Sequence, residues 1–327
     1  MNKAYAVTEE TFDSLTSHWL NPGNRLGWEC LFVLPPWLKA WWSAFGAGLA
    51  PHLRAVRLGD EVIGIAPLLV RGEKASFIGS SEVCDYLDFI VAPGRGREFF
   101  DNLINHLRQQ GISRLDLGPV RADSTVLTDL TGVAKSLGFE SSCEPEDVTL
   151  ELELPGTWDG YLRRLTGKQR HEVRRKLKRL HEAGHVTYRV VEDIDQVREA
   201  MDTFLALFAS NRADKAAFMT GQMASFFRSL AEAMAEVQIL KLCFLDLDAA
   251  PAAAAMCFDY GSTMYLYNNG YDRRFHSLSV GLLSKALSIK ESIRRGTKKY
   301  DFLKGDEGYK RRLGGKKLPL YRCQVTL

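Results

Sequence analysis

Alternating apolar and polar positions in the first half of the chain predict a β-hairpin that is followed by a strand, a helix and another strand. The runs 52–58 and 61–70 alternate in this way and flank the turn dipeptide Gly59-Asp60, which is typical of a hairpin. The elements expected after the hairpin are a strand over 86–91, a loop over 92–96, a helix over 97–110 that ends at Gly111, and a strand over 112–118.

The second half of the chain repeats this order of elements. The runs 237–247 and 252–260 flank a turn at 248–251 and predict another hairpin. The elements expected after it are a strand over 264–271, a loop over 272–279, a helix over 280–295 that ends at Gly296, and a strand over 298–305. The segments QQGISRLDLG and RRGTKKYDFL align without gaps and place Asp116 and Asp301 at equivalent positions. We therefore expect an internal duplication, with one domain over 1–147 and another over 148–327.

A basic helix is predicted between Thr166 and Gly184. Thr166 and Gln169 have the spacing of a capping box, and Gly184 is a typical helix terminator. Within this segment Val173, Leu177 and Leu180 form one apolar stripe, which we expect to be buried.

The cations of this helix divide into two groups when residues are placed at about 100° intervals around the axis. Lys168, Arg175 and Arg179 point away from the apolar stripe and are expected in solvent. Arg170 and Arg174 flank the stripe, where a guanidinium group can reach a neighbouring site. We expect these two arginines either to bind an anionic group of a substrate or to pair with acidic side chains.

Composition limits the functions that this basic helix can serve. The chain has 327 residues, of which 46% are hydrophobic and 25% charged, and its formal net charge is only +3. Basic surfaces are therefore local, and the helix lacks interleaved aromatic residues, which argues against a dedicated nucleic-acid-binding protein. The segment from His181 to His185 matches a zinc-binding spacing, but the helix-ending Gly184 removes His185 from the helical face. We expect no metal site.

Other features predict a cytoplasmic protein. The six cysteines are scattered and form no CxxC pair, which suits a reducing compartment. The N-terminal segment MNKAYAVTEETFDSL has no apolar signal-peptide core. The apolar segment 35–51 is too short to span a bilayer, so we expect a buried amphipathic helix there, with an interfacial membrane helix as the alternative.

Several motifs together give the chain a resemblance to a known family. They are Trp37-Leu38-Lys39-Ala40-Trp41, Ile65-Ala66-Pro67-Leu68, CDYLDFIVAPG, KQRHEVRRKLKRL, YDRRFHSLSVGLLS and YDFLKGDEGYKRRLG. With the repeated element order, they make nearly the whole chain similar to the bacterial BioF2-like or CelD-like acetyltransferases, relatives of the Fem peptidyl transferases that attach amino acids to cell-wall precursors. The resemblance implies an α/β (α+β) fold, a tandem duplication of the GCN5-related N-acetyltransferase (GNAT) fold with mixed, mostly antiparallel sheets and flanking helices.

The resemblance also implies where an acyl donor binds. The GNAT fold holds the donor pyrophosphate where the fourth strand ends and the next helix begins, because free amide groups and the helix dipole face an anion there. The favoured candidates lie at this junction in the second half: His276, Ser277, Ser279 at the N-cap position, Val280 and Gly281. The loop 92–96 is the alternative, and Tyr267 and Asn269 are expected to contact substrate.

Catalytic residues are expected at the last strand of the repeat and just beyond it. The candidates are Asp301, Lys304 and Tyr309, and related acetyltransferases suggest Tyr309 as the general acid toward a departing thiolate. The alternative is that Asp301 is a structural hydrogen-bonding residue and that Tyr309 lies in the core. Asp85 and Asp88, in the corresponding strand of the first half, are expected to hold the acceptor amine.

These observations lead to three hypotheses. The first is a cytoplasmic N-acyltransferase that moves an acyl group from acyl-CoA to an amine of an anionic precursor, either nucleotide-linked or a polysaccharide. In Fem transferases a basic residue of a similar helix contacts the phosphates of a nucleotide-linked precursor, a role that would fall to Arg170 and Arg174. The second is a Fem-type transferase that uses aminoacyl-tRNA, which ranks lower because the chain lacks the long helical arm that some Fem proteins carry for tRNA. The third is a non-catalytic module of envelope-polysaccharide assembly.

Overall fold

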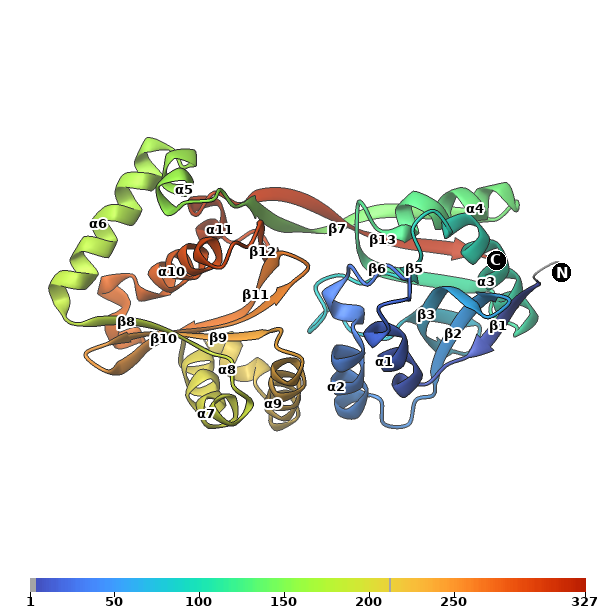
Figure 1. Cartoon of the computed structure of the whole chain (residues 1–327), viewed down its shortest axis with the longest axis horizontal. Coiled ribbons are helices and arrows are strands. Elements are labelled where there is room, and N and C mark those ends of the chain that lie inside the picture. The colour runs from blue at the N-terminus through green and yellow to red at the C-terminus, as the bar shows by residue number, and fades with distance from the viewer. Residues whose placement is uncertain (1–3, 212) are drawn as a thin grey trace. The chain divides into compact units, whose positions relative to one another are not determined.

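The computed structural model describes residues 4–211 and 213–327, which divide into two compact units (Figure 1). Unit 1 contains residues 4–148 together with Leu318–Leu327, and unit 2 contains Thr149–Lys317. The sequence places residues 318–327 in the second domain, and this expectation is corrected. These residues form a ladder with a strand of unit 1, in which Leu320 pairs with Arg121.

Unit 1 consists of one sheet with helices packed around it. Its elements are β1 (Tyr5–Glu9), α1 (Phe12–Leu20), η1 (Leu31–Val33), α2 (Pro35–Phe45), β2 (Pro51–Leu58), β3 (Glu61–Arg71), β4 (Lys74–Phe77), β5 (Ile90–Val91), α3 (Gly96–Gln109), β6 (Arg114–Arg121), η2 (Val126–Leu130), α4 (Thr131–Ser136), the first part of β7 (Glu140–Glu153) and most of β13 (Lys316–Thr326). The strand order is β1-β2-β3-β4-β6-β13-β7, and β5 pairs with β3 outside this path. Helix α3 covers β3, where a β-carbon on Gly64 would meet the ring of Phe99 at 2.3 Å.

The predicted strand over 86–91 is mostly wrong. Only Ile90–Val91 pair with β3, and the sequence missed β4, which pairs with β3 and, in parallel, with β6. Residues 79–89 leave the sheet between these two short strands, and several of their polar groups bond elsewhere. The N–H of Leu87 donates to the carbonyl of Pro119 at 2.8 Å, and the carboxylate of Asp88 accepts from Thr125.

Unit 2 is also a sheet with helices on both faces. Its elements are the end of β7, α5 (Trp158–Arg164), α6 (Gly167–Ala183), β8 (Val186–Val191), α7 (Ile194–Asn211), α8 (Ala213–Phe218), α9 (Gly221–Glu236), β9 (Leu240–Leu247), β10 (Ala250–Tyr260), β11 (Thr263–Tyr271), η3 (Arg273–Leu278), α10 (Val280–Arg294), β12 (Lys299–Lys304) and α11 (Gly308–Arg312). The strand order is β7-β12-β11-β10-β9-β8. Helix α10 packs on one face of this sheet, and α7 and α9 pack on the other (Figure 1).

Both units contain an antiparallel hairpin followed by a crossover helix and a parallel strand. The hairpins are β2–β3 and β9–β10. Helix α3 leads to β6, which is parallel to β4, and α10 leads to β12, which is parallel to β11. The predicted fold class, a duplicated and mostly antiparallel α/β fold, is confirmed.

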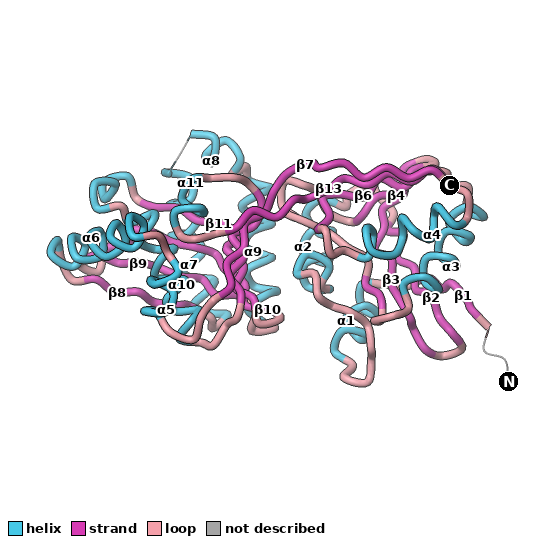
Figure 2. The backbone as a smooth tube through the Cα atoms, turned by 90° about the horizontal axis from the view of Figure 1, so that it is seen from above, coloured by secondary structure: helices cyan, strands magenta, loops and turns pink. Residues whose placement is uncertain are grey.

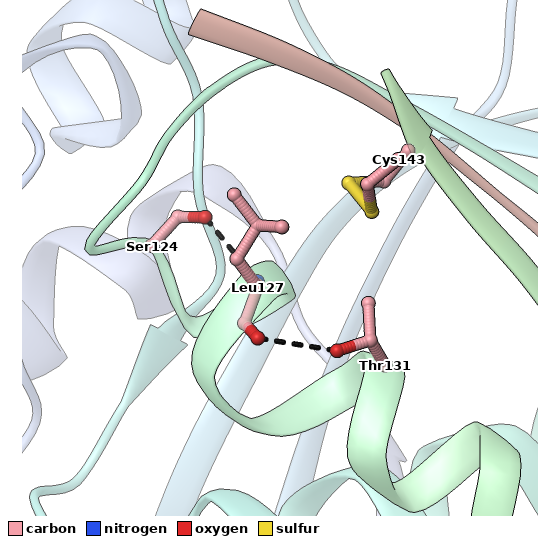
Figure 3. Close-up of a disulfide and its surroundings, with 5 residues drawn as sticks. Ser124, Leu127, Thr131 and Cys143 are labelled. Carbon is pink, nitrogen blue, oxygen red and sulfur yellow. Dashed lines mark hydrogen bonds between the residues drawn. A yellow bond between two sulfur atoms is a disulfide. The ribbon is translucent and has the colours of Figure 1, made fainter. Parts of the chain in front are cut away.

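A disulfide joins the neighbouring strands β7 and β13, which run side by side (Figure 2, Figure 3). It links Cys143 to Cys323, whose Cα atoms lie 4.1 Å apart, as facing residues of adjacent strands do. The structure therefore pairs two of the scattered cysteines, although their spacing suits a reducing compartment. The free thiols are Cys30, Cys84, Cys243 and Cys257.

The apolar segment 35–51 contains α2. Its Trp37, Leu38 and Trp41 are buried, so the expected buried helix is confirmed. Among residues 4–211 and 213–327, the structure contains no helix with the length and apolar character that crossing a membrane requires.

Candidate functional site

The parallel strands β11 and β12 are paired only over their first residues. The ladder runs from Thr263 and Lys299 to Tyr265 and Asp301, and it stops there although both strands continue. On the other edge of β11, the register with β10 shifts and leaves a bulge around Tyr267. We call residues 266–271 of β11 and 302–304 of β12, which are not paired with each other, the strand split.

Helix α10 begins at Val280, just after β11 and η3. Ser279 occupies the expected N-cap position, but its backbone is left-handed with φ of 59° and its hydroxyl makes no capping hydrogen bond. Its carbonyl accepts from Leu282 and Leu283 at 3.0 Å. The first turn of α10 contains no acidic residue, so this helix N-terminus suits an anion.

Tyr271 organises the surroundings of this helix start. Its hydroxyl lies 3.1 Å from Nδ1 of His276, which is exposed like Ser277. Its ring also covers Gly281, where a β-carbon would meet the ring at 2.7 Å. Gly281 is therefore required by the packing of Tyr271, and a larger side chain would displace this ring whether or not a ligand binds.

The start of α3 in unit 1, the alternative donor junction, carries acidic groups. A β-carbon on Gly96 would lie 2.3 Å from the carboxylate of Asp129, and Glu98 lies in the first turn. Carboxylates at this position compete with an anionic ligand. Of the two helix starts, the start of α10 in unit 2 is therefore better suited to an anionic donor.

Asp301 is buried, with 1% of its surface exposed. Its Oδ1 accepts from Oγ1 of Thr149 at 2.9 Å and from the N–H of Leu303 at 2.7 Å. Leu303 has a φ of 60°, and the register with β7 shifts between Asp301 and Lys304. The carboxylate thus holds an irregular stretch of backbone in place, which supports the structural alternative for Asp301.

Lys310 fixes the loop between β12 and α11. It is 2% exposed, and its ammonium group has several acceptors. They are the carbonyls of Leu303 (2.9 Å), Lys304 (2.6 Å) and Gly305 (3.0 Å) and the carboxylate of Glu307 (2.8 Å). The predicted Lys304 contributes its backbone carbonyl here, and Lys310 positions its neighbour in sequence, Tyr309.

Lys285 is a candidate site residue that the sequence analysis missed. It is 5% exposed, its Nζ donates to the carbonyl of Gly281 at 2.6 Å, and the same atom lies 4.7 Å from the ring centroid of Tyr309. Burial lowers the pKa of Lys285 to about 7. The signal in the sequence is that Lys285 is the only charged residue between Val280 and Ile289.

The basic helix is confirmed as α6, and its capping box between Thr166 and Gln169 is present. Val173 and Leu180 are buried as expected, and Leu177 packs on the same apolar cluster.

The two expected substrate-binding arginines of α6 differ in the structure. Arg170 is half-buried, whereas Arg174 is exposed like Lys168, Arg175 and Arg179. The Nε2 of Gln169 donates to the carbonyl of Arg311 at 2.9 Å, which brings the first turn of α6 against α11. Arg170, in this first part of the helix, is therefore the stronger candidate.

The zinc-like spacing does not lie on one helix. Helix α6 ends at Ala183, and the N–H of His185 donates to Oδ1 of Asp248 at 2.8 Å. Within the described ranges 4–211 and 213–327, no three or more His, Cys, Asp or Glu side chains are grouped so that they could hold a metal ion.

The two residues of β11 that were expected to contact substrate, Tyr267 and Asn269, have different surroundings. The ring of Tyr267, 9% exposed, stacks 5.7 Å from Phe227 and lies 5.6 Å from Phe258, so it belongs to the core of unit 2. The carbonyl of Asn269 accepts a hydrogen bond from the ammonium group of Lys215 in α8.

Asp85 and Asp88 lie in the segment 79–89 of unit 1. The carboxylate of Asp88 accepts from Oγ1 of Thr125 at 2.6 Å and from the N–H of Phe89 at 2.8 Å. Burial raises the pKa of Asp88 to about 7. Because these bonds cap a turn before η2, the contacts of Asp88 support a structural role.

Comparison with known proteins agrees with this geometry. Residues 167–311, which include β11, α10 and β12, match the family model described as "Acetyltransferase (GNAT) domain". No curated protein matches the chain in sequence.

Solved structures extend the likeness in fold to the whole chain. FemX is 16% identical with a TM-score of 0.69, over 98% of this chain and 97% of that chain. A conserved protein of unknown function from Bacteroides thetaiotaomicron is 13% identical with a TM-score of 0.60, over 99% of this chain and all (100%) of that one. At these identities the likeness shows the fold. Together with the matched GNAT segment it supports an acyltransferase.

Proposed function

We propose that unit 2 transfers an acyl group from acyl-CoA to an amine of an anionic acceptor. The observation that carries this proposal is the strand split beside the start of α10, inside the matched GNAT segment. A pyrophosphate at the amides of Val280 and Gly281 would leave the acyl end of the donor free to enter the split. The first turn of α3 is less suited to the donor because it carries Glu98 and faces Asp129.

The charges around the split support an anionic acceptor. Lys215, Lys285 and Lys310 come from α8, α10 and α11, and Glu307 supplies a carboxylate among them. Arg170 adds a cation near α11. These cations favour a phosphorylated or carboxylated amine, such as a nucleotide-linked or polysaccharide precursor of the cell envelope in the cytoplasm.

A matched pair of variants at Ser279 tests the donor site. Asp and Asn both tolerate a left-handed backbone and both are good N-cap residues, so neither Ser279→Asp nor Ser279→Asn should unfold α10. The added carboxylate should repel the pyrophosphate. We expect calorimetric titration to show that Ser279→Asp weakens acetyl-CoA binding at least about tenfold, whereas Ser279→Asn changes it little.

Two results would contradict the proposal. The first is equal binding of acetyl-CoA by the two variants, and the second is no binding by the unchanged protein. Asp129→Asn in unit 1 serves as a control and should leave the affinity unchanged. If the unchanged protein binds aminoacyl-tRNA and not acetyl-CoA, the Fem-type alternative replaces this one.

A further inference from the structure

Two buried lysines border the strand split, and their hydrogen bonding differs. Lys310 donates to three carbonyls and pairs with Glu307, so its ammonium group is fully used by the protein. Lys285 is buried to nearly the same extent, but its Nζ has one carbonyl acceptor, Gly281, and the face of Tyr309. A lysine ammonium group has three donors, and leaving them unused in a buried place is costly. Lys285 therefore has donor capacity for another partner.

The position of this amine indicates which partner. It links the first turn of α10, where the donor pyrophosphate is proposed, to Tyr309 on α11, beyond the end of β12. A donor that runs from the start of α10 into the split therefore passes the amine of Lys285. The charged and titratable groups that face this amine come from several elements. They are Lys215 of α8, Cys257 of β10, Glu307 next to α11, and Tyr309 and Lys310 of α11.

We propose that the amine of Lys285 contacts the sulfur of the acyl donor and gives it a proton as the thioester breaks, an inference that rests on the proposed acyl-CoA function. In this step the acceptor nitrogen bonds to the acyl carbon while the carbon–sulfur bond breaks. The ammonium group of Lys285 protonates the sulfur, and the neutral amine then takes the proton that the acceptor nitrogen loses. The products are an amide and a free thiol, and Lys285 returns to its starting state.

The electrostatics of Lys285 suit such a relay. Burial is the main cause that lowers its pKa to about 7, Lys215 and Lys310 lower it further, and Cys257 and Glu307 act in the opposite direction. A group with a pKa near the operating pH can both accept and donate a proton. The aromatic face of Tyr309 stabilises the charged form of Lys285. This cation–π contact is made by the ring, so it does not require the hydroxyl group.

The titration of Lys285 also has a consequence for stability. Its pKa in the folded protein is below that of an exposed lysine, so between about pH 7 and 10 the unfolded chain binds more protons. Stability should therefore rise with pH through this window. Lys285→Met, which removes the buried charge, should abolish this part of the rise and should be at least as stable as the unchanged protein at pH 6.

The decisive experiment measures the ionisation of the CoA thiol bound to the protein, which requires no acceptor. Thiolate absorbance is titrated with pH for CoA bound to the unchanged protein, to Lys285→Met and to Tyr309→Phe. If Lys285 contacts the sulfur, it forms an ion pair with the thiolate, and Lys285→Met should raise the pKa of the bound thiol by at least about one unit. Tyr309→Phe keeps the ring and should change it little.

The outcomes separate this inference from the proposed function. Equal thiol pKa values for the unchanged protein and Lys285→Met overturn the role of Lys285 while leaving acyl-CoA binding intact. If the pKa of the bound thiol rises in Tyr309→Phe and not in Lys285→Met, the proton comes from the tyrosine hydroxyl instead. If CoA does not bind the unchanged protein, the proposed function and this inference both fall.

Discussion

At the scale of single residues, the buried charged groups of unit 2 are distinguished by what they bond to. Asp301 accepts from Thr149 and Leu303, and Lys310 binds the loop carbonyls, so both hold the backbone beyond β12 in its irregular path. Lys285 bonds to one carbonyl and faces an aromatic ring. Complete hydrogen bonding within the protein indicates a structural role, whereas incomplete bonding of a buried charge leaves it able to act on a ligand.

This distinction predicts the behaviour of Asp301 variants. Asp301→Asn keeps an oxygen acceptor for Thr149 and Leu303, whereas Asp301→Ala leaves both donors buried without their acceptor. We expect Asp301→Ala to lower the free energy of unfolding by about 2–4 kcal/mol and Asp301→Asn to cost clearly less, as measured by urea denaturation. Acyl transfer by Asp301→Asn should stay within about threefold of the unchanged protein. A stable Asp301→Asn variant with a hundredfold loss of rate, about 2.7 kcal/mol, would instead make Asp301 catalytic.

At the scale of elements, helix α6 separates cations by the direction in which they point. Its apolar residues Val173 and Leu180 are buried, and the opposite side carries exposed Arg175 and Arg179. Arg170 lies half-buried where the helix start contacts α11. One helix therefore presents one half-buried arginine and a solvated basic surface.

Arginine substitutions on α6 test this separation. Arg170→Ala should raise the KM for the acceptor about tenfold, since a charge-assisted contact contributes about 1.5–3 kcal/mol. The double variant Arg175→Ala with Arg179→Ala should change this KM little, and Arg174→Ala should resemble the double variant because Arg174 is exposed. Steady-state kinetics at two salt concentrations provides the measurement. Equal effects from all these variants would indicate a diffuse basic surface, which is the property of a nucleic-acid partner.

At the scale of the whole molecule, the C-terminal strand returns to the first unit. Strand β13 leaves unit 2 after Lys317 and pairs with β6, and the disulfide from Cys143 to Cys323 attaches it to β7. The disulfide closes a loop with a sequence separation of 180 residues, so it removes much freedom from the unfolded chain.

Thiol counting tests this connection. Titration of the denatured protein without reductant should give four thiols, and after reduction it should give all six cysteines. Reduction, or Cys143→Ala, should lower the free energy of unfolding by about 2–5 kcal/mol. Six thiols before reduction would show that the pair is open in solution and would contradict this prediction.

The sequence by itself determined the hairpins, the helices α3, α6 and α10, and the duplicated order of elements. The signals for these features lie within a few residues of the structures that they specify. Thr166 caps α6 through Gln169, and Gly59-Asp60 closes the first hairpin.

Tertiary structure decided the features whose partners are far apart in sequence. The predicted strand over 86–91 breaks because Asp88 bonds to Thr125, and residues 318–327 return to unit 1 because Leu320 pairs with Arg121. The candidate site depends on the same kind of contact. No sequence signal near α10 shows that the amine of Lys285 will lie against the ring of Tyr309. That contact depends on the folded sheet, in which β11 and β12 are neighbours but are unpaired beyond Tyr265 and Asp301.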